Sequence, residues 1–158
     1  MAYKSAEGPV DLPAFFADLV RCETRLYNAL NDHLRERHGI VTSQFEFLRF
    51  LREHSGARVA DVAAEFAIGA GATSKSVDRL EQRGLIVRQA NPADRRSSLL
   101  ALTGDGSQLL HAAEVTFTAR LGELVEDTLD QNATAAVGRA LRQLRSALER
   151  DGVGTPTG

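Results

Sequence analysis

The chain has 158 residues, 43% of them apolar and 25% charged, which is typical of one globular domain with a buried core. The formal net charge is −2 at pH 7. A single cysteine excludes an intramolecular disulfide and multi-cysteine zinc sites, and the four histidines are scattered along the chain. No apolar run is long enough to span a membrane, and the N-terminus lacks the apolar segment of a signal peptide. We therefore expect a cytoplasmic protein with no metal, no cofactor and no membrane partner.

The first half of the chain predicts helices joined by short turns. Apolar residues recur at helical spacing over 11–37, so we expect one long first helix with Asp11 as its N-cap. A second helix is expected to begin at Thr42 or Ser43, where Ser43 and Glu46 fit a capping box. The next expected elements are a short helix over 58–66, a turn over 69–71 and a fourth helix over 72–83.

The second half predicts a β-hairpin followed by two more helices. Asn91-Pro92 is expected to turn the chain between the two strands of the hairpin. The last helix repeats apolar residues every seven positions, which favours helix-on-helix packing. The expected elements are strands over 85–90 and 98–102, a helix from 104 to about 129, a helix after Asn132 and a disordered tail over 151–158.

The charged residues are unevenly distributed. Between Lys75 and Arg96 six cations stand against three anions, whereas after Gly104 eight anions stand against five cations. The hairpin tip carries Asp94, Arg95 and Arg96, and adjacent arginines repel each other unless they meet a polyanion such as DNA. A solvated turn is the simpler alternative, but a helix-turn-helix directly upstream favours nucleic-acid binding.

These elements define the expected fold class: mainly α with a small two-stranded β-wing, in one domain over 1–158. Residues 42–103 would form a winged helix-turn-helix lobe that binds DNA. The helices over 11–37 and 104–150 carry more apolar surface than such a lobe needs. We therefore expect these N- and C-terminal helices to form a dimer interface.

The fourth helix is expected to enter the major groove. With Val77 and Leu80 turned inward, the helical period places polar residues on the opposite side. Each of them alone could be an ordinary solvated residue. The predicted DNA contacts are Thr73, Ser74 and Lys75 to bases, Arg79 and Arg95 to phosphates, and Arg96 to the minor groove, aimed by a carboxylate–guanidinium pair with Asp94.

Two sequence motifs resemble those of the MarR family of bacterial transcription regulators over about residues 12–148. The wing motif is Asp94, Arg96 and Leu102-Thr103, and the recognition-helix motif is Asp78-Arg79-Leu80-Glu81, Gly84-Leu85 and Arg88. The resemblance implies a homodimer that places two recognition helices and two wings on a palindromic double-stranded operator. It also implies a repressor released by a small anionic or phenolic effector.

One segment departs from the family. The recognition helix starts with Gly69-Ala70-Gly71-Ala72, where relatives carry larger or polar side chains. Fewer side chains there can read bases, so groove shape should supply much of the specificity. The glycines either let the backbone approach DNA closely or weaken the start of the helix, and the sequence leaves both possibilities open.

By the same resemblance, Phe16, Glu23, Phe45 and Arg49 would line an effector pocket between the dimer helices and the lobe. Glu23 falls inside an apolar stripe, and an interface salt bridge is favoured over a ligand contact for it. Cys22 invites comparison with relatives that sense hydroperoxides. The second helix offers phenylalanines in place of the tyrosines of those sensors, so an inert, partly buried thiol is favoured.

An enzyme is the competing function of another class, and the sequence lacks a phosphate-binding loop, a nucleophile elbow and a metal motif. Two alternative functions remain, one that concerns the wing and one that concerns Cys22. One is a winged-helix module that binds protein, which would favour apolar residues at the wing tip, where this chain has Asp94, Arg95 and Arg96. The other is a peroxide-sensing regulator based on Cys22.

Overall fold

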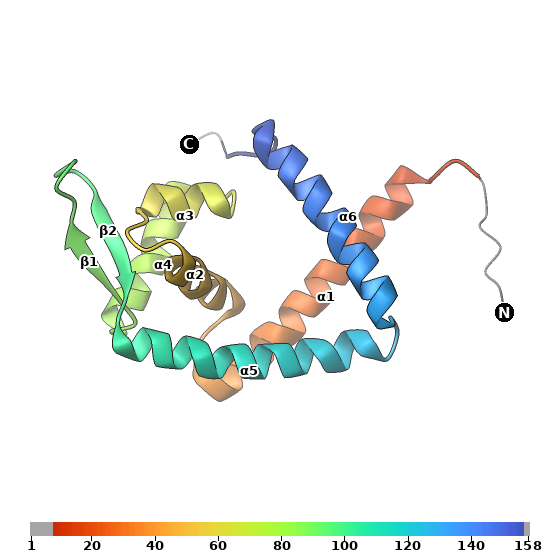
Figure 1. The fold of residues 1–158 in the computed structure, drawn as a ribbon, viewed down its shortest axis with the longest axis horizontal. Coiled ribbons are helices and arrows are strands. Elements are labelled where there is room, and N and C mark those ends of the chain that lie inside the picture. The colour runs from red at the N-terminus through yellow and green to blue at the C-terminus, as the bar shows by residue number, and fades with distance from the viewer. Residues whose placement is uncertain (1–7, 157–158) are drawn as a thin grey trace.

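The computed structural model describes residues 8–156, which form six helices and one two-stranded sheet (Figure 1). The elements are α1 (Leu12–His38), α2 (Thr42–Glu53), α3 (Val59–Glu65), α4 (Ala70–Gln82), β1 (Ile86–Ala90), β2 (Ser98–Leu102), α5 (Gly104–Glu126) and α6 (Gln131–Arg150). Helices α2 to α4 and the β1–β2 hairpin form a lobe, and α5 runs along one edge from this lobe to α6 (Figure 1). The expected fold class is confirmed.

Side chains fix the starts of the long helices. Asp11 caps α1 by accepting a hydrogen bond from the Ala14 amide at 3.0 Å, as the sequence predicted. Thr103 caps α5 and Asp130 caps α6 in the same way. At its other end α1 stops at Gly39, whose φ of 64° is left-handed and therefore suits glycine.

One predicted helix cap and one predicted helix start differ from the structure. Helix α2 begins at Thr42, as expected, but the capping box of Ser43 and Glu46 is wrong, because the N-cap is Val41 and the first amides are capped by other side chains. The Val41 amide donates to Gln44 Oε1, and the Thr42 amide donates to Asn31 Oδ1 of α1, both at 3.1 Å. The glycine-rich segment over 69–71, expected to be a turn, already belongs to α4 from Ala70 onward.

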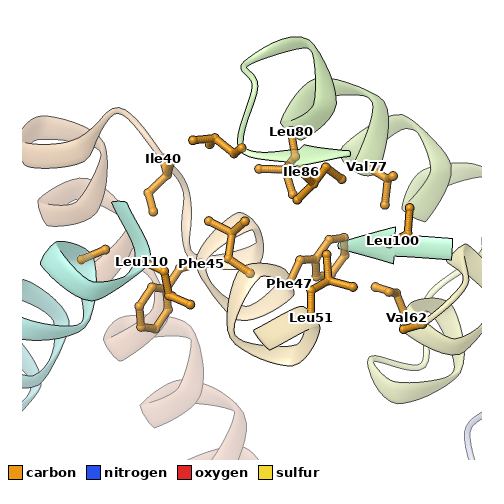
Figure 2. Close-up of a cluster of buried hydrophobic side chains, with 14 of the residues drawn as sticks. Ile40, Phe45, Phe47, Leu51, Val62, Val77, Leu80, Ile86, Leu100 and Leu110 are labelled. Carbon is orange, nitrogen blue, oxygen red and sulfur yellow. The ribbon is translucent and has the colours of Figure 1, made fainter. Parts of the chain in front are cut away.

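The hydrophobic core lies inside the lobe and extends to α1 and α5 (Figure 2). The phenyl rings of Phe45 and Phe117 stack with centroids 4.5 Å apart, which joins α2 to α5. Large side chains that are fully buried include Phe45, Leu34, Ile40, Leu48, Leu51, Leu80, Ile86, Leu100 and Leu110. Each stabilises the fold by about 1.5–3 kcal/mol through burial, so the core fixes how the lobe sits on α1 and α5.

The hairpin is anchored to the lobe at its base. Its antiparallel register pairs Ile86 with Leu102 and Ala90 with Ser98. On the other side of β2, the Leu100 amide donates to the Ala57 carbonyl at 2.8 Å and the Gly56 amide donates to the Leu100 carbonyl at 3.3 Å. This additional bridge, which the sequence did not predict, ties the hairpin to the loop before α3.

Helix α6 and the first half of α1 carry apolar side chains that face solvent in the single chain. No residue of α6 is buried, and on the side of the lobe its Arg145 guanidinium lies 3.9 Å from the Glu65 carboxylate of α3. The exposed apolar side chains are Leu12, Phe15, Phe16, Val20 and Tyr27 of α1, and Val137, Leu141, Leu144 and Leu148 of α6. Helix α6 ends in turns, where the Val153 amide donates to the Leu148 carbonyl at 2.9 Å. Residues 157–158 of the expected disordered tail lie outside the described residues.

Within residues 8–156, no helix combines the length and the apolar character needed to cross a bilayer.

Candidate nucleic-acid interface

Helix α4 buries one side and presents the other to solvent. Val77 and Leu80 are fully buried against the lobe, as the helical period predicted. Lys75 and Arg79 are exposed, and Ser74 is half-buried. The exposed side of α4 therefore offers two cations and one hydroxyl, which are groups that bind phosphate oxygens and base edges.

Thr73 does not belong to this exposed side. Its side chain is fully buried, and its hydroxyl donates to the Gly69 carbonyl at 3.0 Å. A hydroxyl in use within the first turn of the helix cannot reach a base edge. The prediction that Thr73 reads a base is therefore not supported.

The tip of the hairpin is folded by its own polar side chains. The Asp94 carboxylate accepts from the Arg96 backbone amide at 2.9 Å and from the Ser97 hydroxyl at 3.2 Å. The Asn91 side chain accepts from the Ala93 amide at 3.0 Å. Within the described chain no ion pair joins Asp94 to the Arg96 guanidinium. The predicted side-chain pair is wrong, and Asp94 instead shapes the turn from which Arg95 and Arg96 project.

Arg88 joins the hairpin to the recognition helix. From β1 its guanidinium contacts Asp78 at 2.8 Å and Glu81 at 2.6 Å, both on α4. These pairs and burial act on the pKa of Arg88 in opposite directions, and the net effect raises it. No contact of Arg88 was predicted from the sequence. In the structure it ties β1 to α4 and offsets part of the negative charge of the two carboxylates beside the exposed side of α4.

The remaining cations of this region are free to bind a ligand. In the part of the chain that the structure describes, Lys75, Arg79, Arg95 and Arg96 form no ion pair with a carboxylate. All four side chains are exposed. We name this set, on the exposed side of α4 and the hairpin tip, the cationic surface. With Asp94 of the hairpin tip included, four positive charges stand against one negative charge, a formal charge of +3, so a polyanion would be attracted to the surface.

The start of α4 is bare. No side chain caps its N-terminus, and a Cβ built on Gly69 or Gly71 would meet no atom within 4 Å. The backbone amides of the first turn are thus open to solvent. An accessible backbone is what close approach to DNA would need, and the missing side-chain cap is what would weaken the start of the helix.

A cavity of about 750 Å³ lies between α2, α5 and the start of α6. Its wall is mainly apolar and includes the stacked rings of Phe45 and Phe117. Of the predicted pocket residues, Phe45 and Arg49 line it. Phe16 and Glu23 do not, because both are exposed on the part of α1 that extends away from the lobe. Within one chain, the prediction that these four residues share a pocket is therefore wrong.

Arg49 has unused hydrogen-bonding capacity at this cavity. Its guanidinium lies 3.6 Å from Glu46 and 3.6 Å from Glu114, which is close enough for ion pairing but too long for a hydrogen bond. Its Nε is buried without a hydrogen-bond partner. Its central carbon lies 5.9 Å from the centre of the Phe45 ring. The cavity wall therefore combines a guanidinium group with an aromatic surface.

Neighbouring groups determine the charge around Arg49. Arg52 donates two hydrogen bonds of 2.7 Å to the Glu114 carboxylate, and this lowers the pKa of Glu114. Burial raises the pKa of Glu46, against the opposing effect of Arg49. Glu114 is thus committed to Arg52, and α2 is held to α5 through this pair.

Comparison with known proteins identifies the family. A family model described as MarR family matches residues 38–97. The chain is 31% identical over 111 residues to the HTH-type transcriptional repressor MdtR of Bacillus subtilis, covering 66% of this chain and 72% of that protein. It is also 31% identical over 125 residues to the organic hydroperoxide resistance transcriptional regulator of the same organism, covering 79% and 76%. The chain belongs to the MarR family of transcriptional regulators.

A solved structure supports the fold of this MarR-family regulator over its whole length. Sco3205 of Streptomyces coelicolor, a MarR-family regulator crystallised in complex with DNA, superimposes with a TM-score of 0.80. The match covers 99% of this chain and 96% of that protein at 22% identity. The similarity therefore includes α1 and α6 as well as the winged lobe.

Two predicted features of α1 differ from the structure of this MarR-family chain. Cys22 was expected to be partly buried and is exposed. Glu23, expected inside an apolar stripe, is also exposed, and its carboxylate accepts a hydrogen bond only from the Thr24 hydroxyl at 3.3 Å among the described residues. An interface with a second chain is the environment in which the predicted salt bridge of Glu23 could still form.

Proposed function

We propose that this regulator is a homodimer that represses transcription by binding a palindromic double-stranded operator. The observation that carries the proposal is the cationic surface: four exposed, unpaired cations on one helix side and one hairpin tip of a MarR-family winged helix. Since DNA presents a regular array of phosphates, neutralising several of them gives strong, salt-dependent binding. A DNA-binding regulator of this kind would act in the cytoplasm.

Each residue of the interface has a proposed role. Lys75 and Ser74, on the first turns of α4, would contact base edges in the major groove. Arg79 and Arg95 would bind phosphates. Arg96, carried forward by the hairpin tip, would enter the minor groove, where the negative potential is strongest in narrow A·T-rich segments.

The dimer is proposed to form through α1 and α6. Helix α6 buries none of its residues in the single chain although it repeats Val137, Leu141, Leu144 and Leu148 at helical spacing. Most of the stability of a helix in a protein comes from packing its apolar face against another element. Two copies of the chain related by a two-fold axis would cover these faces and place two cationic surfaces toward one duplex.

The effector is proposed to be a small aromatic anion or phenol that binds in the cavity beside α5. Arg49 supplies a positive charge at the cavity wall, and the Phe45–Phe117 stack supplies a flat apolar surface. A ligand there would contact α2 of the lobe and α5 and α6 of the dimerisation region together. Its binding would shift the lobe relative to the dimer axis and so change DNA affinity.

Selection of duplexes from a random pool, followed by affinity measurements over a salt series, tests this function. We expect a palindromic consensus whose half-sites are about one helical turn apart, and a steep loss of affinity with salt. The quadruple substitution of Lys75, Arg79, Arg95 and Arg96 by glutamine should abolish binding while the protein remains folded. Failure to enrich any sequence would favour the alternative, a winged-helix module that binds protein.

A second candidate places a redox sensor on α1. It is favoured by the similarity to the regulator named for organic hydroperoxide resistance and by the exposure of Cys22. A hydroperoxide oxidises an exposed thiol to a sulfenic acid and is itself reduced to the alcohol; the sulfenic acid can then condense with a thiol of another molecule to form a disulfide and water. The test is operator affinity before and after hydroperoxide treatment of the wild-type protein and of Cys22→Ser.

A further inference from the structure

Arg83 forms a direct link between the recognition helix and the end of α1. It is the C-cap residue of α4, and its Nη1 donates to the Gly39 carbonyl at 2.7 Å, across 44 positions of sequence. Gly39 is the left-handed residue that terminates α1. The Arg83 side chain therefore satisfies a carbonyl at the end of one helix while it extends from the end of another.

The same end of α4 is also held to the start of α5. The Thr103 hydroxyl donates to the Gly84 carbonyl at 2.6 Å, and the Thr103 amide donates to the Leu85 carbonyl at 3.1 Å. Thr103 is the N-cap of α5. The C-terminal end of the recognition helix is thus fixed to the two long helices, α1 and α5, that lead to the proposed dimer interface.

We propose that Arg83 is a positioning residue that sets the angle of the recognition helix relative to the dimerisation helices, and thereby the spacing between the two operator half-sites. This inference rests on the proposed function as an operator-binding dimer. Arg83 itself lies at the end of α4 opposite the residues that would meet bases, so it acts through the helix it holds.

Because α4 is long, a small change in its angle moves its DNA-binding end by a large distance. Helix α4 has 13 residues and is therefore about 20 Å long at 1.5 Å per residue. A tilt of about 10° about the end at Arg83 moves the other end by about 3.4 Å, which equals one base-pair step. Loss of the Arg83–Gly39 hydrogen bond at this end would let α4 adopt such tilts. The dimer would then discriminate poorly between half-site spacings.

A phosphate contact is the other role open to an exposed arginine at this place, and salt dependence separates the two roles. Loss of a phosphate contact weakens binding by a similar factor at every spacing and reduces the salt slope by about one. Loss of a positioning contact leaves the salt slope unchanged and lowers the preference among spacings.

The experiment uses the full-length protein and the consensus duplex, with the half-sites brought one base pair closer or moved one base pair apart. The variants are Arg83→Met, which removes the donor, and Arg83→Lys, which keeps one donor for the Gly39 carbonyl. Arg37→Met is the matched control, because it removes one exposed charge from the same end of α1. Thermal unfolding verifies that each variant is folded.

We expect the wild type and Arg37→Met to prefer one spacing by about 10-fold or more, within the range of a mismatched site. Arg83→Met should reduce this preference to less than about 3-fold at an unchanged salt slope, and Arg83→Lys should restore most of it. An unchanged preference in Arg83→Met, or an equal loss at all spacings with a reduced slope, would overturn the proposal. A wild type indifferent to spacing would instead refute the two-half-site function on which it rests.

Discussion

Replacing Gly106 by alanine should destabilise the protein, although alanine favours helices over glycine. Gly106 lies in the first turn of α5, where it is buried against the hairpin base. A Cβ at this position would stand 1.9 Å from the Leu85 carbonyl oxygen and 2.9 Å from its carbon. Because a carbon–oxygen contact needs about 3.3 Å, the two backbone segments would have to separate by about 1.4 Å.

The cost follows from the contacts at this place. Overpacking of backbone against backbone costs about 3 kcal/mol, and weakening of the hydrogen bond from the Thr103 amide to the Leu85 carbonyl adds about 1 kcal/mol. The higher helix propensity of alanine returns at most about 1 kcal/mol. The net loss of about 3 kcal/mol should lower Tm by about 6–12 °C in a domain of this size.

The assay is thermal and urea unfolding at a fixed protein concentration, because dimerisation makes stability depend on concentration. Gly104→Ala is the matched control, since it lies in the same turn and its Cβ would meet no atom within 4 Å. That variant should stay within about 1 kcal/mol of the wild type. If Gly106→Ala were as stable as Gly104→Ala, the close approach of α5 to the hairpin base would be refuted.

Four other substitutions test the interface, the seam between α2 and α5, and the thiol. Arg96→Ala should weaken operator binding by about 1–3 kcal/mol in an anisotropy titration, and near-normal affinity would exclude the minor-groove role. Arg88→Met should lower the free energy of unfolding in urea by only about 1 kcal/mol, because the ion pairs of Arg88 are partly exposed. The loss in operator-binding free energy should be larger than this loss in stability. Equal losses would show that Arg88 does not orient α4. Glu114→Gln should be less stable than the wild type near neutral pH. Since the pKa of Glu114 is lowered by Arg52, that difference should shrink as the pH falls below the ordinary value of 4.5 and vanish below the folded-state pKa. A constant difference would contradict the pairing. Cys22→Ser should leave operator binding and its response to hydroperoxide unchanged, and loss of that response would establish the redox candidate.

The sequence predicted the order of elements and most of their bounds because periodicity and capping are local properties. The N-cap at Asp11 and the two strands are examples. The start of α4 was misjudged for a physical reason. The segment over 69–71 contains two glycines and no capping side chain, so nothing in it marks where the helix begins.

The parts of the site that could not be predicted depend on tertiary contacts. The pattern of exposed residues on α4 predicted Lys75 and Arg79, but whether Thr73 faces solvent depends on how α4 lies on the lobe. The bonding of Asp94 is set by the fold of a seven-residue tip, where two donors, the Arg96 amide and the Ser97 hydroxyl, occupy its carboxylate oxygens. Arg88 could have been found, since two carboxylates three positions apart on α4 share one helix side.

The residues that line the cavity were also only partly predicted from the sequence. Phe45 and Arg49, which the family resemblance assigned to an effector pocket, both line the cavity, because residues four positions apart share one side of α2. The resemblance also assigned Phe16 and Glu23 to that pocket. Those two residues lie on the half of α1 that extends beyond the lobe, and helical spacing does not report the direction in which a long helix leaves the core.

A crystal structure of the protein bound to its selected duplex would show directly whether α4 and the hairpin tip bind DNA from a two-fold dimer. We expect two copies joined through α1 and α6, with Lys75 of each in the major groove and Arg96 of each in the flanking minor groove. A complex in which the duplex lies against another surface, or in which one copy binds alone with the hairpin tip away from DNA, would contradict this expectation.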